Sequence, residues 1–139
     1  MTTTKLPKPN TPVTVADLLA LALEHGKDDI VAVLESNPPD DVFVSDGCSM
    51  WPDKWFGSDI YPACFWHDVR YWSGLEGDDL ARLKADAELM VDVAAIASVN
   101  LGVTMFSGVR MGGSEHLNTS FRWGYGRPSR NAFSHPFSQ

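Results

Sequence analysis

Four side chains that can do chemistry fall at one helical spacing in the middle of the sequence. Cys64, His67, Asp68 and Tyr71 occupy positions i, i+3, i+4 and i+7, which lie on one face of an α-helix. A proline near the start and a glycine after the end predict a helix over 62–73. A histidine that a carboxylate holds in place can act as a general base, so this face is a candidate for hydrolytic chemistry.

A second helix, predicted over about 79–99, carries the acid that such a histidine needs. Its apolar stripe is expected to consist of Leu83, Ala87, Met90, Ala94 and Ala97. Asp86 is placed on the flank of that stripe, where it either reaches solvent or is held by a partner, because an unpaired buried carboxylate is costly.

His67 and Asp86 are expected to meet if the two helices form an antiparallel hairpin. His67 lies six residues before Ser73, and Asp86 lies seven residues after Asp79. At about 1.5 Å of rise per residue, the two side chains lie within about one residue step of the same height. The sequence therefore predicts a His–Asp pair that activates water and needs no serine or cysteine nucleophile.

The loop before the first of these helices offers ligands for a hard cation. Asp46 and Asp68 supply two carboxylates and Gly47 supplies a backbone carbonyl, and Ca²⁺ prefers oxygen ligands of this kind. Cys48 and Cys64 flank the loop and would join it to the helix by a disulfide. In the chain-entropy model, closing a loop of about 15 residues is worth about 3 kcal/mol.

Other interpretations of these residues remain open at this stage. Taken alone, His67 is better explained as a core histidine and Asp68 as a charge on the helix surface than as catalytic residues; the active-site interpretation depends on the whole set of residues. In a reducing compartment the two cysteines would stay thiols. They would then be free to hold zinc with His67 and His116, although their spacing fits none of the common zinc patterns.

The ordered set of residues resembles the calcium loop and catalytic helices of the secreted phospholipases A2, most of all the small bacterial and fungal branch of that superfamily. The resemblance covers about residues 45–97 of the chain. It rests on Asp46-Gly47-Cys48-Ser49, Pro52-Asp53, Phe56-Gly57, Pro62-Ala63-Cys64, His67-Asp68, Tyr71 and Lys84-Ala85-Asp86 with Met90.

The resemblance implies a role for each matching residue. His67 would deprotonate the attacking water, Asp86 would orient His67, and Tyr71 would support the pair. Ca²⁺ would polarise the ester carbonyl. Its ligands would be Asp46, Gly47 and Asp68. Three aromatic residues beside the loop suit contact with a lipid interface, or alternatively packing in the core. They are Trp51, Trp55 and Phe56.

The predicted fold class is mainly α. The four expected parts are an extended arm (1–13), a helical hairpin (14–37), a phospholipase A2-like core (38–100) and a basic tail (101–139). The core contains the calcium-type loop and the antiparallel helix pair 62–73 and 79–99. Beyond Asn100 the helical periodicity is lost and glycines recur, which predicts a loop-rich segment with short strands at most.

The charge of the chain excludes one class of function. Among 139 residues there are 11 basic and 18 acidic side chains, for a net charge of −7, so nucleic-acid binding through a surplus of Lys and Arg is not expected. Residues 101–139 contain four arginines and one glutamate, so this segment carries +3 and the first hundred residues carry −10. The tail would either cover the acidic body or dock on a partner.

Two functions follow from the sequence. The first is a calcium-dependent, phospholipase A2-like esterase that acts on a phospholipid or membrane surface. The second is a non-catalytic structural or assembly component, for example of a phage virion, that contacts other virion proteins through 1–13 and 101–139. The resembling family is secreted, whereas no signal peptide and no membrane span are visible in this sequence. The expected location is therefore a virion, or otherwise the cytoplasm or release without a classical signal.

Overall fold

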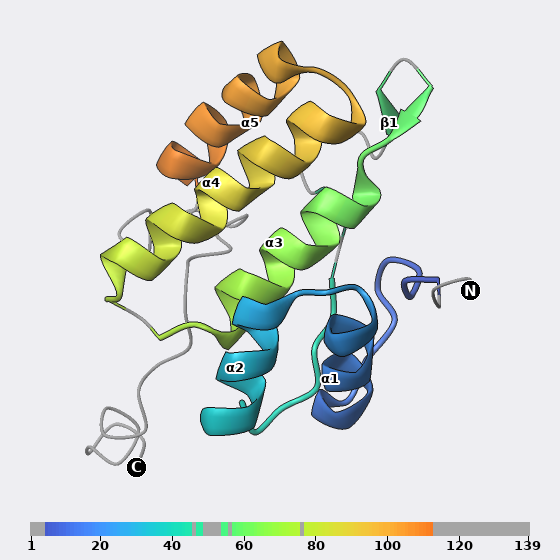
Figure 1. Ribbon diagram of the computed structural model, residues 1–139, viewed down its shortest axis with the longest axis vertical. Helices are drawn as coiled ribbons and strands as arrows, with labels where there is room; N and C mark the ends of the chain where they lie inside the picture. Colours follow the sequence, from blue (N-terminus) through green and yellow to red (C-terminus); the bar gives the residue numbers. More distant parts are fainter. Residues whose placement is uncertain (1–4, 46, 49–53, 56, 76, 113–139) are drawn as a thin grey trace.

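Helix α3, Tyr61–Ser73, runs through the middle of the molecule, with a pair of helices on each side of it (Figure 1). The structure is a computed structural model that describes residues 5–45, 47–48, 54–55, 57–75 and 77–112. The remaining elements are α1 (Val15–Glu24), α2 (Asp28–Ser36), β1 (Lys54–Trp55), β2 (Ser58–Asp59), α4 (Asp79–Ile96) and α5 (Val99–Gly112). The mainly α fold expected from the sequence is confirmed.

The two helices α1 and α2 form the predicted hairpin and pack on one side of α3. Thr14 caps α1 by accepting a hydrogen bond from the backbone N–H of Asp17 at 3.1 Å, and Gly26 turns the chain with a φ of 72°. The apolar faces of both helices bury against α3, so the hairpin belongs to the body of the protein. The shared cluster includes Leu18, Ala22, Ile30, Leu34, Phe65, Trp66 and Val69.

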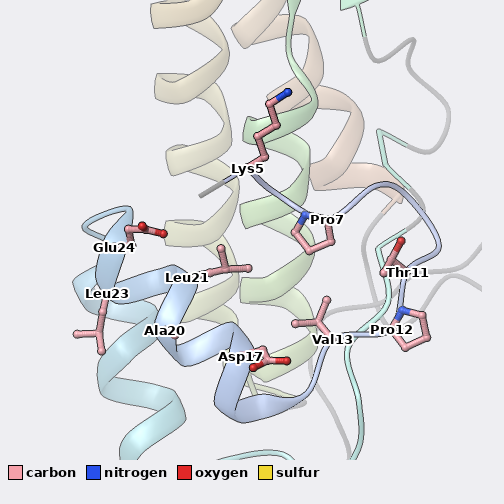
Figure 2. Close-up of a pocket in the computed structure, with 10 residues that line it drawn as sticks. All are labelled: Lys5, Pro7, Thr11, Pro12, Val13, Asp17, Ala20, Leu21, Leu23 and Glu24. Atoms are coloured by element: carbon pink, nitrogen blue, oxygen red, sulfur yellow. The ribbon is translucent and has the colours of Figure 1, made fainter. Parts of the chain in front are cut away.

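The described part of the N-terminal arm is fixed to the body by backbone hydrogen bonds. Val13 and Phe43 form an antiparallel bridge, and the N–H of Asn10 donates to the carbonyl of Ser45 at 2.6 Å. Tyr61 donates its hydroxyl to a carbonyl of the arm at 2.6 Å. A hollow of about 840 Å³ lies between the arm and α1 (Figure 2).

The buried face of α4 differs from the predicted stripe. The side chains buried on this helix are Ala85, Asp86, Leu89 and Val93, whereas Leu83 is 41% exposed. The buried face is therefore rotated, and Asp86 lies within it and not on its flank. Three of the five residues of the predicted stripe are alanines, whose small apolar surface gives a weak indication of the buried direction.

The C-terminal boundary of the helical region was predicted wrongly. Helix α4 ends at Ile96, and the first part of the predicted loop-rich tail is helix α5, which folds back along α4 (Figure 1). Gly102, one of the recurring glycines that predicted a loop-rich segment, lies inside α5, where a Cβ atom would come within 2.6 Å of the carbonyl oxygen of Met90. This glycine allows two helices to approach closely. Residues 113–139 of the tail lie outside the described residues.

Two further features complete the fold. Cys48 and Cys64 form the predicted disulfide, which joins the loop to α3. Strands β1 and β2 pair as a small antiparallel ribbon within that loop. In the part of the chain that the structure describes, no helix combines the length and the apolar character needed to cross a membrane.

Candidate active site

His67 of α3 and Asp86 of α4 meet between the two helices. Nε2 of His67 lies 2.8 Å from Oδ1 of Asp86, and both residues are buried, with 4% and 0% of their surface exposed. The expectation that the hairpin places them level is confirmed. The contact forms because the antiparallel helices bring positions at equal distance from the turn to the same height.

Tyr71, one helical turn after His67, joins the same carboxylate. Its hydroxyl donates to Oδ1 of Asp86 at 2.6 Å, and its ring lies 4.3 Å from the His67 ring between centroids. Nε of Arg82 in turn donates to the Tyr71 hydroxyl at 3.3 Å. Two residues of α3 (His67 and Tyr71) and two of α4 (Arg82 and Asp86) therefore form one hydrogen-bonded network.

Two arginines complete the network, and the sequence analysis did not assign either of them to it. Nη1 of Arg110 on α5 donates to Oδ2 of Asp86 at 2.7 Å, and Nε of Arg82 lies 4.0 Å from the same oxygen. Arg82 also donates from Nη2 to the carbonyls of Val109 and Arg110, at 3.0 and 2.6 Å. The i, i+4 spacing of Arg82 and Asp86 was a visible signal. Arg110 lies 24 residues from Asp86, and no local sequence pattern links the two.

The electrostatics of the network favour a neutral imidazole beside an ionised carboxylate. Burial lowers the pKa of His67, Asp86 opposes this, and the charges of Arg70 and Arg82 add to the lowering, so the pKa falls below 6.5. Burial alone would raise the pKa of Asp86, but hydrogen bonds from His67, Tyr71 and Arg110 outweigh it and lower the pKa.

These protonation states determine what the pair can do. An ionised Asp86 accepts hydrogen bonds only, so Nε2 of His67 carries the proton that it shares with the carboxylate. Nδ1 is then the ring nitrogen that can accept a proton. Burial, and then the charge of Asp86, raise the pKa of Tyr71, so its hydroxyl remains a donor to Asp86 at neutral pH. The arrangement is suited to general-base chemistry.

The candidate cation ligands lie on the loop and on the residue after His67. The hydroxyl of Ser45 donates to Oδ2 of Asp68 at 2.6 Å and accepts from the N–H of Gly47 at 3.0 Å. Ser45 thus brings together two of the three predicted ligand residues, and Gly47 adopts a positive φ of 84°. Asp46, the third predicted ligand, lies outside the described residues.

Of the predicted calcium ligands, the structure describes the carboxylate of Asp68 and the backbone of Gly47, both of which hydrogen-bond to the Ser45 hydroxyl. Ca²⁺ takes carboxylate and carbonyl oxygens, and the contact that Gly47 makes here is through its N–H. Within the described ranges, no group of three or more His, Cys, Asp or Glu side chains is placed to hold a metal ion. The predicted calcium ligands include only two such side chains, Asp46 and Asp68, and the third ligand is the backbone of Gly47. The absence of a group of three or more side chains therefore does not test this set.

The zinc alternative is wrong, because Cys48 and Cys64 are joined to each other and zinc is bound by free thiolates. Its proposed fourth ligand, His116, lies outside the described residues. Among the lipid-interface candidates, Trp51 and Phe56 also lie outside them. Trp55 is described only through its backbone, as part of β1.

The chain was compared with known proteins, and no protein-family model, no curated protein and no solved structure matches it. The geometry of the His67–Asp86 network therefore carries the functional argument.

Proposed function

We propose that this protein is a calcium-dependent, phospholipase A2-like esterase that hydrolyses an ester bond of a glycerophospholipid. The observation that carries the proposal is the buried contact between Nε2 of His67 and Oδ1 of Asp86 at 2.8 Å. A neutral imidazole held by an ionised carboxylate is the general-base half of a hydrolytic site. Tyr71 and Arg110 support the pair by holding the two oxygens of Asp86.

The proposed reaction uses water as the nucleophile. Nδ1 of His67 takes a proton from water while the water oxygen forms a bond to the ester carbonyl carbon. Asp86 stabilises the imidazolium that results. The bond from the carbonyl carbon to the glycerol oxygen then breaks, and His67 returns the proton to that oxygen. The products are a fatty acid and a lysophospholipid.

Asp68 and Gly47, with Asp46, would hold the calcium ion. Bound there, Ca²⁺ would polarise the ester carbonyl and stabilise the negative charge that develops on its oxygen. Ser45 supports this assignment, because its hydroxyl holds Asp68 and Gly47 together. Trp51, Trp55 and Phe56 are proposed to contact the lipid surface.

The test is release of fatty acid from vesicles of phosphatidylcholine or phosphatidylglycerol by the oxidised full-length protein. We expect hydrolysis with Ca²⁺, its loss with a chelator, and its loss in His67→Gln. His25→Gln is the matched control, since His25 lies at the end of α1 beside Trp66 and should leave the rate unchanged. Circular dichroism confirms that each variant is folded.

The opposite result points to the alternative function. If the folded, calcium-loaded protein hydrolyses neither lipid, the chain is better explained as a structural or assembly component, for example of a phage virion. The backbone contacts of Asn10 and Val13 with the body bear on the N-terminal part of that alternative. Through these hydrogen bonds, the described part of the arm is held against the body of the same chain.

A further inference from the structure

An apolar surface on the solvent side of helices α4 and α5 is left open by the described residues. Gly102 of α5 lies against the α4 backbone at Met90 and Ala94. The core fills one side of this contact, whereas the residues next to it on the other side are exposed, Val91 by 56% and Val103 by 48%. The exposed apolar residues on this side, which we call the outer face, are Leu80, Leu83, Val91, Val99 and Val103.

The spacing of these residues places them on one side of each helix. Leu80, Leu83 and Val91 fall at i, i+3 and i+11 of α4, and Val99 and Val103 fall at i and i+4 of α5. In Figure 1 the two helices lie side by side, at the edge of the molecule away from α1. The outer face is therefore continuous across the pair.

Two features indicate that the outer face makes a contact. Between its exposed residues lie the half-buried Ala87, Met90 and Ala94, so it contains most of the apolar stripe that the sequence predicts as buried. The exposed side chains of α5 are all uncharged, in a chain in which 21% of the residues are charged. They are Val99, Asn100, Val103, Thr104, Ser107 and Met111. A continuous exposed apolar surface marks a site of interaction.

The C-terminal segment of the same chain starts beside this face. Residues 113–139, which lie outside the described residues, follow α5 directly. The end of α5 is held at the start of α4, because Nη2 of Arg82 donates to the carbonyls of Val109 and Arg110. Nine extended residues beyond Gly112 span about 30 Å, and the 18 residues of α4 are about 27 Å long. The chain from residue 121 onward can therefore reach every part of the outer face.

The segment contains the side chains that such a face accepts. Phe121, Trp123 and Tyr125 occupy every second position, and alternate side chains of an extended chain point to the same side. The three rings together bring a large apolar area to one side of the segment. Arg122, between the first two rings, would point to the opposite side.

The charges favour the same contact. The segment contains three arginines and one glutamate, for +2, and the net −7 of the chain leaves −9 on residues 1–112. On its solvent side, α4 carries Asp79, Glu88 and Asp92 against Lys84. We propose that residues 113–139 fold back over the outer face, with the rings of 121–125 on its apolar side chains and the arginines near the acidic residues of α4.

This proposal does not depend on the esterase. No residue of the outer face belongs to the hydrogen-bonded network of His67 and Asp86, so the contact can be tested whether or not the protein hydrolyses lipid. A second copy of the chain and a lipid surface are the competing occupants, and the experiment distinguishes them.

The experiment is photo-cross-linking of the full-length oxidised protein in which p-benzoylphenylalanine replaces Trp123. Irradiation should join this residue to α4 or α5 within the same chain, as mass spectrometry of a mixture of unlabelled and isotope-labelled protein can show. Val103→Asp should remove this cross-link. Leu23→Asp, the same kind of change at an exposed residue of α1, should leave it unchanged.

Other patterns of cross-linking or binding would overturn the proposal. Cross-links only between labelled and unlabelled chains would assign the outer face to a second copy, and cross-links to neither helix would place the segment elsewhere. Vesicles of ether-linked phosphatidylcholine contain no ester to hydrolyse. Binding of the protein to them, with its loss in Val103→Asp, would assign the face to a lipid surface.

Urea unfolding provides a second test that needs no cross-linker. Val103→Asp should lower the unfolding midpoint, because it places a carboxylate under the covering rings. In a Trp123→Ser background the same change should lower the midpoint less, since the effects of residues in contact are not additive. Equal shifts in both backgrounds would refute the contact. If Val103→Asp does not fold, Val91→Gln tests the same face in the same two backgrounds.

Discussion

Replacing Arg110 by methionine tests whether α5 completes the buried network. The substitution keeps an unbranched side chain and removes the guanidinium that donates to Oδ2 of Asp86 at 2.7 Å. Oδ1 keeps its contacts with His67 and Tyr71. Oδ2 is left with Arg82, whose Nε lies 4.0 Å away.

The size of the effect follows from the burial of the two partners. A hydrogen bond to a charged group is worth about 1.5–3 kcal/mol, and breaking a fully buried ion pair costs about 3–5 kcal/mol. Asp86 is fully buried, but the side chain of Arg110 is 31% exposed, and water screens part of its charge. We therefore expect Arg110→Met to lower the free energy of unfolding by about 2 kcal/mol at pH 7.

The effect should depend on pH with a definite sign. Because the folded-state pKa of Asp86 lies below its ordinary 3.8, its stabilising contribution is present above pH 3.8 and is lost as the pH falls through the folded-state value. The difference between the variant and the unmodified protein should therefore shrink in strong acid.

Urea unfolding measures both quantities. With a slope of about 2 kcal/mol per molar urea, the midpoint should fall by about 1 M at pH 7. Arg110→Lys keeps the charge and loses the planar guanidinium, so its urea midpoint should lie between those of Arg110→Met and the unmodified protein. Equal midpoints for Arg110→Met and the unmodified protein at pH 7 would refute the stabilising role assigned to this contact.

Three further predictions concern the loop, the helix crossing and the histidine. Ser45→Ala should weaken Ca²⁺ binding about tenfold, measured by calorimetry, because Asp68 loses the hydroxyl that holds it; unchanged affinity would remove Ser45 from the site. Gly102→Ala should lower the free energy of unfolding by about 1 kcal/mol in urea melts, because the cost of overpacking against the α4 backbone exceeds the gain in helix propensity. An increase in stability would contradict the close crossing. Because the pKa of His67 is lowered, its contribution to stability is complete above pH 6.5 and is lost as the pH falls through the folded-state value. The rate of lipid hydrolysis should likewise stay at its plateau down to about pH 6.5, and a plateau that begins only above pH 7 would show that the base is not a desolvated histidine.

Local rules were sufficient for the part of the site that lies on one helical hairpin. The contact of His67 with Asp86 follows from the rise per residue and an antiparallel turn. The start of α1 follows from the hydroxyl of Thr14, which caps the helix. The cap lies within one turn of helix, and the His67–Asp86 contact needs only two consecutive helices and the short turn between them.

The features that the sequence did not predict depend on long-range packing. Gly102 has the same local signature as a turn glycine, and only the approach of the α4 backbone shows why the position lacks a side chain. Arg110 reaches Asp86 because α5 folds back along α4. In the sequence, Arg110 contributed only to the positive charge of the segment 101–139, and nothing indicated that it contacts Asp86. The rotated face of α4 was missed because alanines mark a buried direction poorly.

Helix α5 ends beside Asp86, and this limits how far the protein can be shortened from its C-terminus. A chain that stops at residue 112 keeps Arg110 and the two carbonyls that orient Arg82. A chain cut before residue 109 loses all three, so removal of the basic segment in search of an assembly partner would also disrupt the hydrogen-bonded network around Asp86. Trimming after residue 112 is therefore the experiment that separates a role in assembly from a role in lipid hydrolysis.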